Sequence, residues 1–99
     1  MTITKKQDGS NLTIVLEGRL DTSTSPQLEN ELRSGLNGVT SLVFDLDQLA
    51  YVSSAGLRVL LSAQKTMARQ GDMLIRNVKP EIMEIFEVTG FVDILTIEE

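Results

Sequence analysis

The feature that most limits the possible folds is the alternation of short apolar runs with longer segments of helical periodicity. Short runs rich in strand formers occupy residues 12–16, 42–46 and 73–75. Between them, apolar residues recur at helical spacing over residues 26–36 and 55–70. Strands separated by helices become parallel neighbours in a sheet that the helices cover. The chain is therefore predicted to form an α/β fold.

The two ends of the chain add further elements to this core. An alternating stretch and a turn over residues 2–11 precede the first apolar run and predict an antiparallel hairpin. Pro80 is placed to open a third helix, and Gly90 to follow it in a left-handed conformation, before a last short strand over residues 91–97. The resulting order, β-β-α-β-α-β-α-β, predicts one domain over residues 1–99 with a mixed, mostly parallel sheet and packed helices.

The helical segments have predicted ends and faces. Ser25 is the predicted N-cap of the first helix, with Pro26 at its first helical position. The second helix is predicted to bury an apolar face made of Leu57, Leu60, Leu61, Met67 and Ala68. Its other face carries the basic residues Arg58, Lys65 and Arg69. Exposure to solvent is the ordinary explanation of such a face, and docking of an acidic partner surface is the alternative.

The charge balance argues against several kinds of partner. The chain has 14 acidic and 9 basic residues and a formal net charge of −5, which opposes attraction to nucleic acid or anionic lipid. Neither a membrane-spanning run nor the apolar core of a signal peptide is apparent in the sequence. We therefore expect a cytoplasmic protein with a protein partner, with no direct contact to nucleic acid or membrane.

The absence of histidine and cysteine weakens most catalytic hypotheses. A Ser-His-Asp mechanism, a His- or Cys-ligated metal site and a cysteine nucleophile all require residues that the chain lacks. The sequence contains neither of the glycine-rich nucleotide-binding motifs G-x-x-x-x-G-K-[ST] and G-x-G-x-x-G. One enzymatic alternative remains, a serine hydrolase that uses a lysine as its base. Asp45 and Asp47 suggest a second alternative, a receiver domain that is phosphorylated on aspartate. Their simpler explanation is that both are solvated loop residues. We expect no enzyme activity, cofactor or metal.

Two serines lie where a short strand is predicted to give way to the second helix. The run reads Tyr51-Val52-Ser53-Ser54-Ala55-Gly56-Leu57. The first N–H groups of a helix lack internal partners, so either serine could cap the helix or accept a phosphate there. Gly56 would allow another molecule to approach closely, or would allow close packing of helix on strand. From physical chemistry alone, capping and packing are the favoured interpretation.

The chain resembles the STAS family, and within it the single-domain bacterial anti-sigma factor antagonists. Four blocks carry the resemblance: residues 16–21, 42–46, 51–57 and 85–91. The resemblance implies that Ser54, two positions before Gly56, is phosphorylated by an anti-sigma factor that is itself an ATP-dependent kinase. Many members carry aspartate immediately before that serine, whereas this chain has Ser53.

The resemblance also implies a mechanism of partner switching. The unphosphorylated antagonist binds the anti-sigma kinase and frees a sigma factor, phosphorylation breaks the complex, and a serine phosphatase restores it. The implied recognition surface consists of Asp21, Thr22, Ser23, Ser53, Ser54, Ala55 and Gly56. A local Asx turn or helix cap is an equally good explanation of Asp21, Thr22 and Ser23. A STAS scaffold or transport subunit that works without phosphorylation is the alternative function.

Overall fold

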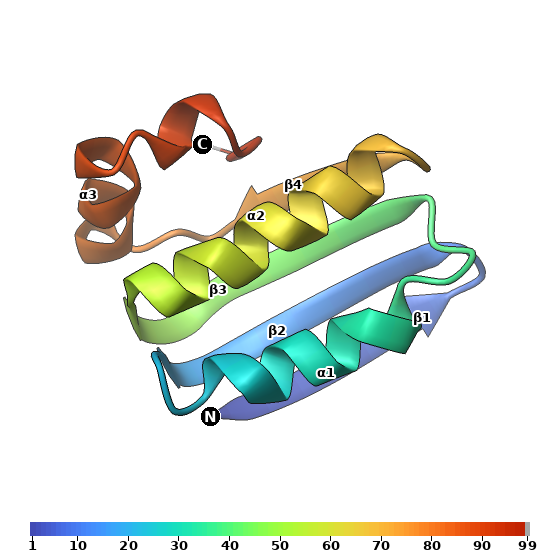
Figure 1. The fold of residues 1–99 in the computed structure, drawn as a ribbon, viewed down its shortest axis with the longest axis horizontal. Coiled ribbons are helices and arrows are strands. Elements are labelled where there is room, and N and C mark those ends of the chain that lie inside the picture. Colours follow the sequence, from blue (N-terminus) through green and yellow to red (C-terminus); the bar gives the residue numbers. More distant parts are fainter. Residues whose placement is uncertain (99) are drawn as a thin grey trace.

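The computed structural model describes residues 1–98, which form four strands, three α-helices and a short 3₁₀ helix (Figure 1). In chain order these are β1 (Thr2–Asp8), β2 (Asn11–Leu20), α1 (Ser25–Gly35), β3 (Ser41–Val52), α2 (Ser54–Ala68), β4 (Asp72–Arg76), α3 (Pro80–Val88) and η1 (Phe91–Asp93). No helix within this part of the chain combines the length and apolar character that a bilayer span requires.

The strands form a single mixed sheet in the order β1-β2-β3-β4. β1 and β2 are the predicted antiparallel hairpin, and β2, β3 and β4 run parallel to one another. Helices α1 and α2 lie side by side across the same face of the sheet, and α3 lies beyond it at one end (Figure 1). The predicted α/β class and mixed, mostly parallel sheet are therefore confirmed.

The core lies between the sheet and the two helices that cross it. Alternate residues of β2 and the first half of β3 point into it, as a period of two requires. The largest fully buried side chains come from every layer: Ile14, Leu16, Leu20, Leu28, Leu42, Phe44, Leu46, Leu49, Leu60, Met67, Ile75 and Phe86. This continuous core fixes where the ends of β2 and β3 lie.

Strand β3 is much longer than the predicted strand over residues 42–46, because it continues to Val52. Its inward residues Leu46, Leu49 and Val52 are three apart, whereas a regular strand points every second residue inward. This spacing does not indicate a strand in the sequence. The register against β2 shifts in two places, between Val15 and Glu17 and between Gly18 and Arg19. Such bulges let one strand gain a residue while its apolar side chains still reach the core.

The predicted last strand over residues 91–97 is wrong. Gly90 is left-handed as expected (φ +80°), and the backbone then turns through η1 with Asp93 N–H donating to the Gly90 carbonyl oxygen. Backbone groups committed to these turns cannot join a sheet ladder. Only Ile97 forms an isolated parallel bridge, to Ile75.

Two details of the helices also differ from expectation. Thr24, not Ser25, is the N-cap of α1, and Ser25 is a buried first residue of the helix. In α2, Leu61 is only half-buried and Ala68 is exposed, whereas Val59 and Ala63 are buried in their place. Packing against α1 as well as the sheet rotates the buried face of α2 away from the predicted stripe.

Gly71, at the turn between α2 and β4, provides a test of this packing. A Cβ at Gly71 would overlap the backbone carbonyl of Thr40, whereas one at Gly35 meets nothing within 4 Å. We expect Gly71→Ala to lower the free energy of unfolding by about 1–3 kcal/mol, the usual cost of overpacking. Gly35→Ala should be neutral or stabilising by up to about 1 kcal/mol. Urea denaturation followed by circular dichroism measures both, and equal values for the two variants would contradict the close approach of Gly71 to Thr40.

Candidate functional site

The loops that follow β2 and β3 meet at one end of the sheet. Leu20 and Val52 are paired at the ends of these neighbouring parallel strands. The Ser53 N–H donates to the Leu20 carbonyl oxygen (2.9 Å), which joins the loop that starts at Asp21 to the start of α2. Loops at the carboxyl ends of parallel strands are the usual place for sites in α/β folds. The segments that carry the predicted site residues are therefore adjacent.

Ser53 is the N-cap of α2. Its backbone is extended (φ −96°, ψ 176°), and its hydroxyl oxygen accepts a hydrogen bond from the Gly56 N–H (3.4 Å). Its carbonyl oxygen accepts the first intrahelical bond, from the Leu57 N–H (2.9 Å). The capping interpretation is thus confirmed for Ser53, because its hydroxyl pairs with an N–H group of the first helical turn.

Ser54 has a different environment from its neighbour. It is the first residue of α2 and is exposed, and its hydroxyl forms no hydrogen bond within residues 1–98. It lies in the first turn of the helix, where N–H groups are unpaired and negative charge is favoured. The geometry therefore distinguishes two serines that physical chemistry alone left interchangeable: Ser53 caps the helix, and the hydroxyl of Ser54 is free.

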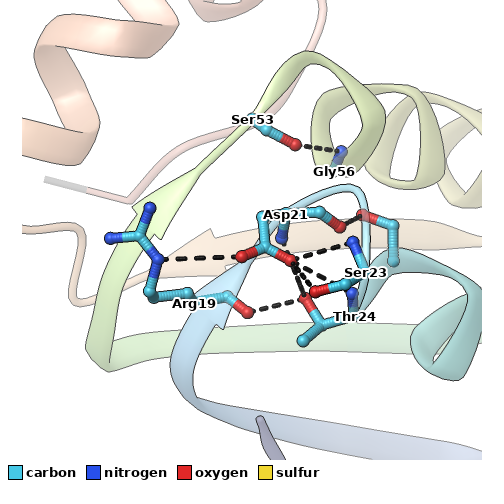
Figure 2. Close-up of polar contacts among 7 residues, drawn as sticks. Arg19, Asp21, Ser23, Thr24, Ser53 and Gly56 are labelled. Atoms are coloured by element: carbon cyan, nitrogen blue, oxygen red, sulfur yellow. Dashed lines mark hydrogen bonds and ion pairs between the residues drawn. The ribbon is translucent and has the colours of Figure 1, made fainter.

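Asp21 organises the neighbouring loop through its side chain. Its Oδ1 accepts hydrogen bonds from the Ser23 N–H (3.0 Å), the Ser23 hydroxyl (2.8 Å) and the Thr24 N–H (3.1 Å). The Thr24 hydroxyl in turn accepts from the Asp21 N–H (2.8 Å) and donates to the Arg19 carbonyl oxygen (2.7 Å). Figure 2 shows the bonds from Ser23 and Thr24 converging on the Asp21 carboxylate, with the Thr24–Arg19 bond beside them. The local Asx turn is confirmed, and it gives the loop a defined shape.

This network also affects the ionisation of Asp21. The hydrogen bond from the Ser23 hydroxyl, together with the N–H groups of Thr24 and Ser23, holds the pKa of Asp21 below its ordinary value of 3.8 despite some desolvation. Hydrogen bonds to the charged form favour that form. The loop therefore presents a carboxylate at neutral pH.

Arg19 and Tyr51 form a contact at the site that the sequence analysis missed. The Arg19 guanidinium lies over the Tyr51 ring, 4.4 Å from its centroid, and its Nε is 3.7 Å from Oδ2 of Asp21. The two residues are paired in the register of β2 and β3. Both lie in the sequence blocks that carry the family resemblance, but their meeting depends on a bulged register that composition does not reveal.

Ala55 and Gly56 have unequal access to the surface. Thr22 and Ala55, together with Arg58, line a hollow of about 200 Å³ between the starts of α1 and α2. Gly56 is buried, and a Cβ there would lie 2.7 Å from Leu20 Cγ. The packing explanation of Gly56 is confirmed, because only glycine lets α2 start this close to β2.

Asp45 and Asp47 do not share one environment. Both belong to β3, so the expectation of loop residues is wrong. Asp47 is exposed, as a solvated residue should be, whereas Asp45 is half-buried. Burial raises the pKa of Asp45, yet hydrogen bonds from the Asp47 N–H and the Asn77 amide, with the nearby Arg76 guanidinium, lower it overall. No group of three or more potential metal ligands occurs within residues 1–98.

The comparison with protein families matches a STAS domain model to residues 2–99. The chain belongs to the STAS domain family. BtrV of Bordetella bronchiseptica, a putative anti-sigma factor antagonist by name, is 35% identical over 99 residues, covering 98% of this chain and 85% of BtrV. The anti-sigma-B factor antagonist of Listeria monocytogenes is 29% identical over 97 residues, covering 95% of this chain and 84% of that protein. The resemblance inferred from the four sequence blocks is confirmed.

Solved structures of this STAS domain's neighbours agree on the fold. An anti-sigma factor antagonist from Mycobacterium paratuberculosis superposes with a TM-score of 0.87 at 18% identity, covering 97% of this chain and 83% of that one. The Bacillus cell fate determinant SpoIIAA in its phosphorylated form gives a TM-score of 0.75 at 18% identity, covering 99% and 92%. These likenesses concern the fold.

The different tasks of the two serines can be tested by alanine substitution. Ser53→Ala removes the cap of α2 and should lower the free energy of unfolding by about 0.5–2 kcal/mol. Ser54→Ala removes a free hydroxyl and should change it by less than about 0.5 kcal/mol. Thermal and urea denaturation of both variants measure these changes. A larger loss of unfolding free energy for Ser54→Ala than for Ser53→Ala would contradict the assignment of Ser53 as the cap.

The Asp21 network predicts a dependence of stability on pH. A carboxyl whose pKa is lowered by folding stabilises the fold above its unfolded pKa and loses that contribution as pH falls through the folded value. The stability difference between wild type and Asp21→Asn should therefore be largest near neutral pH and shrink below pH 3.8. Urea denaturation from about pH 6 to about pH 3 measures it. A difference that stays constant with pH would show that the charge of Asp21 contributes nothing.

Proposed function

We propose that this STAS protein is an anti-sigma factor antagonist regulated by phosphorylation of Ser54. In its unphosphorylated form it binds an anti-sigma factor kinase and so releases a sigma factor, and phosphorylation ends that binding. A serine phosphatase then restores the active form. The name of the Listeria relative and the match over almost the whole chain support this role.

The observation that carries the proposal is the free hydroxyl of Ser54. A kinase must reach the oxygen that it modifies, and Ser54 is exposed on the first turn of α2 while Ser53 is engaged with Gly56. A phosphoryl group adds a charge of about −1.5 to −2 at neutral pH, which the start of a helix favours. SpoIIAA, which has the same fold, exists in both unphosphorylated and phosphorylated forms.

The proposed recognition surface combines both loops at this end of the sheet. The rigid loop of Asp21, Thr22 and Ser23 lies beside Ser54 and Ala55, so a partner that covers the serine also meets this loop. Ser53 and Gly56 act by positioning α2. A phosphate that meets no cationic group of the partner across that interface would cost several kcal/mol to bury, on the order of the binding energy of individual hot spots.

In this role the protein is a substrate and ligand in the cytoplasm, with no catalytic residue of its own. The alternative function, a STAS scaffold that works without phosphorylation, can be distinguished from this role by experiment. Such a scaffold would bind its partner without any modification of Ser54 in the presence of ATP.

The modification itself is the first test. The chain should be incubated with each anti-sigma factor kinase of its genome and ATP, and the products mapped by mass spectrometry. We expect one phosphate on Ser54, retained in Ser53→Ala and lost in Ser54→Ala. Binding to a kinase with no modification of Ser54 would contradict the switch and favour the scaffold.

The effect of charge is the second test. Ser54→Asp should weaken binding to the anti-sigma kinase by at least about tenfold, because the interface accommodates a neutral hydroxyl. Its thermal stability should match or exceed that of wild type, since the first turn of a helix tolerates an acidic residue. Titration calorimetry and thermal denaturation measure the two effects, and Ser54→Asn, which is polar and uncharged, is the control. Equal affinity of both variants would count against the electrostatic account.

A further inference from the structure

Helix α2 concentrates positive charge in an otherwise acidic chain. Residues 48–71, which include all of α2, contain no aspartate or glutamate, although the whole chain has 14. The same segment carries Arg58, Lys65 and Arg69. The rest of the molecule is correspondingly more acidic than its net charge of −5 suggests. The domain is therefore electrically polarised, with α2 as its positive side.

The three basic residues form a stripe in line with Ser54. Positions 54, 58, 62, 65 and 69 follow the helical repeat along one face, and all five residues are exposed. With a rise of 1.5 Å per residue, Arg58 lies about 6 Å, Lys65 about 16 Å and Arg69 about 22 Å along the axis from Ser54. Figure 1 shows α2 lying along one face of the sheet, beside α1. We call Arg58, Lys65 and Arg69 the basic stripe.

The charges of the basic stripe are not neutralised inside the molecule. Lys5, Arg19, Arg33 and Arg76 each form an ion pair, whereas within residues 1–98 no member of the stripe does. Glu29, across the hollow from Arg58, is engaged by Arg33 (3.2 Å). An exposed row of one sign is a surface that attracts the opposite sign.

We infer that the basic stripe is a docking surface for an acidic face of the same protein partner that covers Ser54. This inference rests on the proposed function. A stable interface buries about 800 Å² of each partner, which extends roughly 16 Å in every direction from its centre. A partner centred near Ser54 therefore covers Arg58 fully and Lys65 at its edge. Arg69 lies beyond that edge and attracts the partner only through its longer-range field. The chain's net charge disfavours the polyanionic alternatives, nucleic acid and lipid.

The same geometry links the stripe to the switch. Arg58 lies four residues after Ser54, the spacing at which side chains on a helix meet. A phosphate on Ser54 would pair with Arg58 and neutralise the end of the stripe nearest the centre of the interface. Phosphorylation would then remove an attractive charge as well as add a repulsive one.

The test compares charge reversals along the helix. Arg58→Glu, Lys65→Glu and Arg69→Glu are measured by biolayer interferometry against each purified anti-sigma factor of the genome that binds wild type. We expect losses of affinity of about tenfold, threefold and less than twofold in that order, mainly in the association rate and smaller at high salt. Arg58→Gln should lose less than Arg58→Glu. Lys6→Glu, an equal charge change on β1 at the opposite end of the sheet, is the control and should stay within about twofold of wild type.

The possible results separate the two proposals. If an anti-sigma factor binds wild type and loses affinity on Ser54→Asp but not on any stripe reversal, the stripe inference fails and the switch stands. If no anti-sigma factor binds, both fail. Sedimentation at low salt and binding of a DNA duplex and of phosphatidylserine vesicles are measured in parallel. The inference is also overturned if the reversals abolish self-association, DNA binding or vesicle binding while leaving the anti-sigma complex intact.

Discussion

The site depends on the parallel pairing of β2 with β3, and above all on the last residue pair of these two strands. Leu20 and Val52 face each other there, and the Ser53 N–H donates to the Leu20 carbonyl oxygen. Gly56 then lets α2 pass against Leu20 without a Cβ in the way. Without this close approach, the Asp21 loop and the start of α2 would be two separate surface features. The core below them fixes their spacing, because the strands that carry them are buried along most of their length.

The rigidity of both loops comes from hydrogen bonds that each loop makes within itself. Asp21 holds its loop through Ser23 and Thr24, and Ser53 holds the first turn of α2 through Gly56. Preorganised surfaces bind with a smaller loss of conformational entropy. In this arrangement the residues that shape the surface are distinct from the exposed hydroxyl of Ser54, so modification of that hydroxyl leaves the supporting bonds in place.

Much of the fold could be predicted from periodicity, and the failures have physical causes. The helices were found because Leu28, Leu32 and similar residues recur at the helical period. The second half of β3 was missed because its bulges space Leu46, Leu49 and Val52 three apart. The last strand was over-predicted because β-forming residues after Gly90 are used in turns, which composition does not distinguish.

At the site, the family blocks selected Ser54 over Ser53. The structural difference between the two serines is the hydrogen bond that the Ser53 hydroxyl accepts from the Gly56 N–H. That bond could not be predicted, because it depends on the exact residue at which the helix begins.

The isolated bridge at the C-terminal end has a consequence for how the sheet meets other molecules. Ile75 donates its N–H to the Thr96 carbonyl oxygen and accepts from the Glu98 N–H, so the outer edge of the short strand β4 is occupied at its fourth residue. The other edge, β1, exposes Lys6, which forms no ion pair within residues 1–98 and whose charge opposes the addition of a further strand. Growth of the sheet by strand addition is thus discouraged at both borders, and the protein can be abundant in a cell without its sheets joining edge to edge.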